Sequence, residues 1–241
     1  MSTTPTLLAP APETFVYMGK EELQQQKYLR SYNRYIARMF SRIITPGQTV
    51  LDFGAGVGTI AELVQQCARP GKTVCIELDL ENAAHLRGMG FEVHPNAGEC
   101  ARGSVDAIFS SNVLEHVEDE VDTLRELRAC LKPGGRGVFW VPAFQCLWTP
   151  FDARVGHFRR YRKESLERVF REAGFQVERC VYQDSAGFFV ALLFRMIASS
   201  DGSVNAKSFW IYDRFVFPLS RVLDLVCSGF LGKNLLIYVR K

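Results

Sequence analysis

The sequence of 241 residues lacks the features that mark membrane-spanning and secreted chains. No apolar run reaches the roughly 18–20 residues that a membrane-spanning helix needs. Residues 1–12 have neither a basic region nor a long apolar core, so they do not resemble a signal peptide. We therefore expect no transmembrane span, a mobile N-terminal tail over residues 1–19 and a single domain over residues 20–241.

The sequence also has no clustered cysteines and little net charge. Its seven cysteines are scattered, their number is odd and none forms a Cys-x-x-Cys pair. This distribution is typical of reduced thiols in a cytoplasmic protein, and we expect no metal site. The net charge of +3 and the lack of a long basic tract indicate that nucleic acid is not a partner.

Strand-like and helix-like segments alternate along most of the chain. The expected strands are 49–53, 73–77, 91–94, 105–110, 137–141, 175–182 and 235–240, and the expected helices include 21–44, 118–131 and 163–173. This alternation predicts an α/β fold with a Rossmann-like, mainly parallel sheet that is covered by helices on both faces.

The most informative segment is residues 50–58, VLDFGAGVG, in which an apolar run leads to Asp52 and three glycines follow at alternate positions. It is typical of a strand, a tight turn and a helix start, where the backbone approaches a nucleotide-like cofactor. The turn has no Gly-Lys-Ser/Thr of a phosphate-binding loop, and Thr59 stands where the dinucleotide fingerprint needs glycine. An acid at position 52 suits a cofactor with a cationic or amino end. The alternative is that the glycines bind no cofactor and only permit tight packing of the strand against the following helix.

Polar side chains follow the next three expected strands at the same edge of the sheet. Glu77 ends the second strand, Asn96 and Ala97 follow the third, and Asn112 follows the fourth. We expect Glu77 to accept both ribose hydroxyls of a cofactor, as the acid of dinucleotide folds does. The Asn96 amide would contact the adenine edge.

Together with residues 112–117 (NVLEHV) and 131–135 (LKPGG), these segments resemble the ordered motifs of class I S-adenosylmethionine-dependent methyltransferases of the type 11 or type 12 branch. The resemblance covers about residues 45–145. It implies a seven-stranded sheet with an antiparallel last strand, S-adenosylmethionine as cofactor and S-adenosylhomocysteine as product. The cofactor site that it implies consists of Asp52, Gly54, Ala55, Gly56, Glu77, Leu78, Asn96, Ala97, Asn112 and Val113. Asn96 stands where an aspartate is often found.

Residues 152–161, DARVGHFRRY, are similar to a bacterial subgroup with a D-x-x-x-G-H-x-R-R-Y pattern. That subgroup is often linked to glycosyltransferases and to polysaccharide or lipid assembly. The segment lies where class I enzymes commonly build the acceptor pocket, and its charges suggest a polar or anionic acceptor.

The catalytic candidates are His157, His116, Tyr161 and Arg160. We prefer His157 as the general base for a hydroxyl acceptor, because histidine takes up protons near neutral pH. The alternative is a structural loop in which Asp152 pairs with Arg159 or Arg160. For His116 the separate alternative is that it only braces its own loop.

About fifty residues, 183–234, form a helical insertion before the last strand, where the methyltransferase fold usually has a short connection. They contain apolar helix-like runs over 188–197 and 209–226, and we expect Pro218 to kink the second. In that run Arg214, Arg221 and Asp224 lie opposite an apolar stripe. The simplest interpretation is two helices packed on the sheet. A substrate cap, a homodimer surface and an interfacial membrane contact are the alternatives.

These features favour a methyltransferase that moves a methyl group to oxygen of a small-molecule, saccharide or lipid-linked acceptor. A dehydrogenase is a second possibility, which Thr59 disfavours. A third is a catalytically silent methyltransferase-like module that binds a partner through its apolar insertion.

Overall fold

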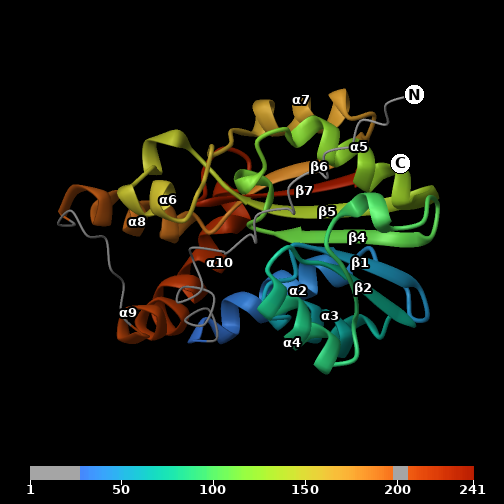
Figure 1. Ribbon diagram of the computed structural model, residues 1–241. Helices are drawn as coiled ribbons and strands as arrows, with labels where there is room; N and C mark the ends of the chain where they lie inside the picture. The colour runs from blue at the N-terminus through green and yellow to red at the C-terminus, as the bar shows by residue number, and fades with distance from the viewer. Residues whose placement is uncertain (1–27, 198–205) are drawn as a thin grey trace, which may run out of the picture.

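The computed structural model describes residues 28–197 and 206–241 (Figure 1). Its centre is a seven-stranded sheet in the order β3-β2-β1-β4-β5-β7-β6. The strands are β1 (Thr49–Phe53), β2 (Lys72–Ile76), β3 (Glu92–His94), β4 (Val105–Ser111), β5 (Leu131–Pro142), β6 (Gln176–Gln183) and β7 (Asn234–Arg240). Strands β1 to β5 pair in parallel, whereas β7 is antiparallel to both β5 and β6. The expected α/β fold is therefore confirmed.

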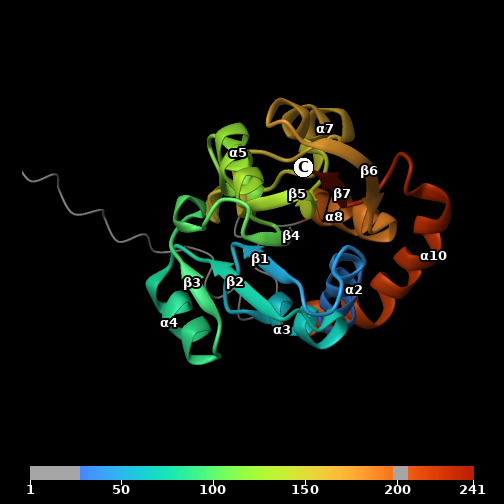
Figure 2. The same cartoon turned by 90° about the vertical axis from the view of Figure 1, so that its right-hand side faces the viewer.

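Helices cover both faces of the sheet (Figure 2). One face packs against α5 (Glu120–Cys130) and α7 (Lys163–Glu172), and the other packs against α2 (Arg30–Ser41) and α3 (Thr59–Ala68). A further helix, α4 (Leu80–Gly88), follows β2. The N-terminal tail and the first part of the helix expected over 21–44 lie outside the described residues.

Consecutive side chains of each central strand belong to opposite cores. In β1 Leu51 lies in the core under α5 and α7, whereas Val50 lies in the core over α2 and α3. Ile108 and Phe109 of β4 divide in the same way. A strand that is buried on both faces is apolar at successive positions, which explains the unbroken apolar runs in the sequence.

In its described residues, 184–197 and 206–233, the insertion forms four helical segments between β6 and β7. They are α8 (Ser185–Ile197), α9 (Ala206–Ile211), a π-helical segment η5 (Tyr212–Val216) and α10 (Phe217–Cys227). The helix expected over 209–226 is thus interrupted, as π segments commonly interrupt α-helices. Pro218 lies in the first turn of α10, where its missing N–H costs little.

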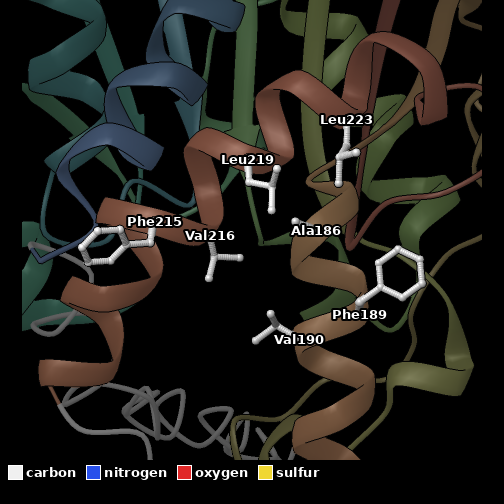
Figure 3. Close-up of a pocket in the computed structure, with 7 residues that line it drawn as sticks. All are labelled: Ala186, Phe189, Val190, Phe215, Val216, Leu219 and Leu223. Atoms are coloured by element: carbon white, nitrogen blue, oxygen red, sulfur yellow. The ribbon is translucent and has the colours of Figure 1, made fainter.

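Phe217 at the start of α10 packs against the sheet, in the core that contains Leu236 and Tyr238 of β7, but the polar side of this helix also turns inward. Asp224 is buried, whereas Val222, Leu225 and Val226 are 63%, 84% and 79% exposed. An apolar cavity of about 400 Å³ lies between α8 and the segment η5–α10 (Figure 3). Its lining residues are Ala186, Phe189, Val190, Phe215, Val216, Leu219 and Leu223. These side chains carry no polar group, so the cavity offers no acid, base or metal ligand.

No helix within residues 28–197 and 206–241 is both long enough and apolar enough to cross a bilayer.

Candidate active site

The turn after β1 requires glycine for both conformation and space. Gly54, Gly56 and Gly58 have φ angles of +76°, +56° and +82°. A Cβ on Gly54 would lie 2.3 Å from Cγ2 of Val113. The Gly54 amide donates to the carbonyl of Ile76 at 3.0 Å, so the turn is held against the end of β2. The backbone is therefore open to close approach by a ligand at this edge.

Asp52 is a buried carboxylate with an unused acceptor. Its side chain is 3% exposed, and Oδ2 accepts no hydrogen bond from the described residues. Burial, and next the charge of Glu77, raise the pKa of Asp52 well above its ordinary value. An unpaired buried carboxylate is unfavourable. The site therefore suits a ligand that brings an ammonium group or another hydrogen-bond donor.

Glu77 links the glycine turn to the segment after β2. Its Oε2 accepts from the Gly56 amide at 2.7 Å, and its Oε1 accepts from the Asp79 amide at 2.9 Å. Burial raises the pKa of Glu77, although these two hydrogen bonds oppose the shift. A carboxylate oxygen can accept more than one hydrogen bond, so both oxygens of Glu77 keep acceptor capacity for ligand hydroxyls.

The remaining predicted cofactor residues lie after strands β2, β3 and β4. Leu78 is 54% exposed beside Glu77, and Ala97 is buried. The Asn96 amide nitrogen donates to Oε1 of Glu99 at 3.4 Å. Asn112 has a φ of +54°, and its backbone N–H donates to the Trp140 carbonyl of β5 at 2.8 Å. The parallel register of β1 to β4 brings these segments to the same carboxyl edge of the sheet.

Asp152 is the centre of the segment that follows β5. It lies in α6 (Pro150–Arg154) and is fully buried. Its Oδ1 accepts from Nδ1 of His157 at 2.8 Å and from Nε of Arg160 at 2.8 Å. Its Oδ2 accepts from the Thr149 amide at 2.9 Å and from Nη2 of Arg160 at 3.0 Å. Burial alone would raise the pKa of Asp152, but the bonds from His157 and Arg160 hold it well below its usual range.

Arg160 and Tyr161 support the site rather than project freely. Arg160 is committed to both oxygens of Asp152, which is the pairing expected for a structural loop. The Tyr161 hydroxyl donates to Oε2 of Glu120 at 2.6 Å. Burial, and next Glu120, raise the pKa of Tyr161. Both side chains therefore position the segment that carries His157.

Glu115 is a residue that sequence reasoning missed as a functional group. It follows β4 in the 3₁₀ turn η3 (Leu114–His116), is fully buried, and neither Oε1 nor Oε2 has a hydrogen-bond partner among the described residues. Burial raises the pKa of Glu115 to about 8. Its Oε1 lies 3.9 Å from Nε2 of His157. The available signal was its place beside His116 in a loop at a strand end.

The two loop histidines meet at this point. The rings of His116 and His157 are 4.5 Å apart between centroids and nearly perpendicular. Burial, and next His157, lower the pKa of His116 to about 4. The loops are joined by the backbone, because the Phe158 amide donates to the Glu115 carbonyl at 2.8 Å. The structure thus brings together His116 and His157, which the sequence separates by forty residues.

Known proteins resemble this chain in sequence and in fold. The profile of the methyltransferase domain matches residues 23–179. A probable S-adenosylmethionine-dependent methyltransferase of Mycolicibacterium smegmatis is 28% identical over 155 residues, which are 59% of this chain and 56% of that protein. A ubiquinone biosynthesis O-methyltransferase of Xanthomonas campestris is 30% identical over 104 residues, 39% of this chain and 43% of that protein.

Among solved structures, a complex of the Haloferax volcanii Trm112 methyltransferase activator with a methyltransferase matches with a TM-score of 0.63 at 18% identity. The match covers 92% of this chain and 95% of that one. The chain spans about half the length of the curated relatives it matches. Because the domain profile covers well over half of the sequence, this chain belongs to the methyltransferase-domain family.

Proposed function

We propose that the chain transfers the methyl group of S-adenosylmethionine to oxygen of a small-molecule, saccharide or lipid-linked acceptor. The observation that carries the proposal is Asp52, a buried carboxylate with an unpartnered oxygen beside a glycine turn. The amino group of the methionine end supplies the donor that Oδ2 lacks. The names of the relatives in Mycolicibacterium and Xanthomonas support this cofactor and reaction type.

We assign the other cofactor contacts to residues that follow β2, β3 and β4 at the carboxyl edge of the sheet. Glu77 would hold the ribose hydroxyls, Asn96 and Ala97 would flank adenine, and Asn112 would line the pocket near the sulfur. When bound, the cofactor supplies a methyl group on a sulfonium sulfur, which already has a good leaving group. The protein's task is then to align the acceptor and to take its proton.

The acceptor side lies between the loops after β4 and β5. Asp152 holds Nδ1 of His157, so Nε2 is the ring atom that can face an acceptor. His116 and Glu115 lie against the same ring. We assign uptake of the acceptor's proton to His157, with His116 and Glu115 beside it. Arg160 and Tyr161 have positioning roles. On the same loop Phe158 is exposed, whereas Arg159 is half-buried and pairs with Glu120.

Calorimetry with S-adenosylmethionine, S-adenosylhomocysteine and NAD tests the cofactor. We expect micromolar binding of both sulfur compounds and none of NAD. No heat with either sulfur ligand on folded protein would overturn the proposal. Transfer of a labelled methyl group into saccharide or lipid fractions of a bacterial extract would then separate an enzyme from a silent binding module.

A further inference from the structure

Glu115, His116 and His157 form a compact group of potential metal ligands. One ligand atom from each lies within 4.8 Å of the other two. They come from two separate segments, since Glu115 and His116 follow β4 whereas His157 follows α6. The fold therefore brings His157 to the adjacent pair Glu115 and His116 of the turn η3.

Glu115 supplies independent evidence that something is bound there. The side chain is 0% exposed, and both of its carboxylate oxygens lack a hydrogen-bond partner in the part of the chain that the structure describes. Buried acids are normally paired or bound to a metal, because an isolated one is strongly unfavourable. The charge of Arg160 favours the ionised form of Glu115 but leaves its oxygens without a hydrogen bond, and Nε2 of His157, at 3.9 Å from Oε1, is too far to donate one.

The surroundings of His157 match those of a metal-bound imidazole. A carboxylate that accepts the proton of the second ring nitrogen fixes the tautomer and the orientation of a ligating histidine. Asp152 does this for Nδ1 at 2.8 Å, and Arg160 in turn orients Asp152 through two hydrogen bonds. Nε2 is thereby left on the side of Glu115. The ring of His116 is likewise held, by hydrogen bonds to the backbone at Gly156 and Val155.

We propose that Glu115, His116 and His157 bind one divalent transition-metal ion, of the class represented by Zn²⁺ and Co²⁺. Two imidazoles and one carboxylate favour such an ion over Mg²⁺ or Ca²⁺, which prefer oxygen ligands. Three protein ligands leave a coordination position open, as catalytic metal sites do. An acceptor oxygen bound there would be more acidic, and His157 would then hold the ion in place of acting as the general base. The effect of the ion on the acceptor rests on the proposed function, whereas the binding of the ion does not. The proposed site replaces the expectation that the chain has no metal site.

Co²⁺ absorbance on metal-stripped, tag-free protein tests the site, with competition by Zn²⁺. We expect one Co²⁺ per chain and a loss of affinity of at least tenfold in both Glu115→Gln and His157→Gln. Asp152→Asn tests the support of His157, and a loss of about 10–100-fold is expected. His85→Gln is the matched control, because His85 is exposed on α4, and its affinity should be unchanged.

The outcomes separate this inference from the proposed function. Failure of folded wild-type protein to bind Co²⁺, or equal binding by Glu115→Gln, overturns the metal site. A buried ion pair between Glu115 and His157 would then be the explanation of the cluster. Calorimetry with S-adenosylhomocysteine on the same metal-free protein reports on the cofactor site alone. Loss of that binding with Co²⁺ binding intact would contradict the proposed function and leave the metal site standing.

Discussion

Asp213 caps the N-terminus of α2 from the far end of the chain. Its Oδ1 accepts from the Tyr32 amide and its Oδ2 accepts from the Ser31 amide, both at 2.9 Å. The residue at the cap position itself, Leu29, has no side-chain acceptor. Two of the helix's unpaired N–H groups are thus satisfied by the π segment of the insertion.

Asp224 does the same for α8. It accepts from the amides of Asp184 and Ser185, both at 2.9 Å, while Ser220 accepts from the Ala186 amide at 3.0 Å. These contacts explain why the polar side of α10 faces the protein. Asp224 serves the buried start of α8, and the apolar side of α10 is left outward.

We predict that Asp213→Ala and Asp224→Ala each lower the free energy of unfolding by about 1–3 kcal/mol, the cost of leaving buried hydrogen-bond donors unsatisfied. Leu225→Ala is the control, because that side chain is 84% exposed and its loss should change stability little. Urea unfolding measures all three. Equal effects for Asp224→Ala and Leu225→Ala would contradict the capping role.

Gly54→Ala should destabilise the protein more than Gly134→Ala. The two glycines have φ angles of +76° and +74°, so a side chain costs about 1–2 kcal/mol at either position. Only Gly54 adds a clash, with Val113, whereas the space beside Gly134 is open. Val113→Ala in the Gly54→Ala background should recover part of the loss. Urea midpoints that show no difference between the two glycine variants would refute the close approach.

Asp52→Asn should stabilise the ligand-free protein at pH 8 and weaken cofactor binding. The pKa of Asp52 is raised in the folded state, so the folded protein holds this proton more tightly than the unfolded chain. Its contribution to stability therefore falls as the pH rises above the unfolded value. We expect a gain in Tm of about 2–4 °C, the shift for about 1 kcal/mol in a chain of this size. The gain should shrink toward pH 4, and a constant gain across this range would contradict the assignment.

Glu77→Gln should weaken S-adenosylhomocysteine binding by about 1.5–3 kcal/mol, the range for hydrogen bonds to a charged group. The amide retains one acceptor for the Gly56 or Asp79 amide, which Glu77→Ala does not. The difference in dissociation constant between Glu77→Gln and Glu77→Ala measures how much Glu77 contributes by holding the glycine turn in place. A dissociation constant that is unchanged by calorimetry would exclude Glu77 as the ribose ligand.

His157→Ala and Arg160→Lys should reduce turnover by about 100-fold or more while cofactor affinity stays nearly constant. Lysine keeps the charge of Arg160 but loses the two-pronged contact with Asp152. The measurements are kcat for an identified acceptor and calorimetry for the cofactor. Parallel loss of cofactor affinity would place these residues on the cofactor side instead.

The strands and the cofactor turn were predictable because their signals are local. The apolar run of β1, Asp52 and the three glycines all lie within residues 49–58. The orientation of α10 was not predictable, since the partners of Asp213 and Asp224 are backbone amides of other helices. The grouping of Glu115 with His157 was hidden for the same reason, because β4 and β5 must pair before their loops meet.

The place of β6 in the sheet has a consequence for the order of folding. Among the strands that the structure describes, β6 lies at the edge of the sheet and pairs with β7 alone, and the whole insertion separates the two in sequence. During synthesis β1 to β5 emerge with their partners and local crossovers, but β6 has no neighbour until the insertion and β7 have been made. Contacts that span such a long loop form late. Pulsed hydrogen exchange during refolding should protect the amides of β1, β2 and β4 before those of β6, and simultaneous protection would argue against this order.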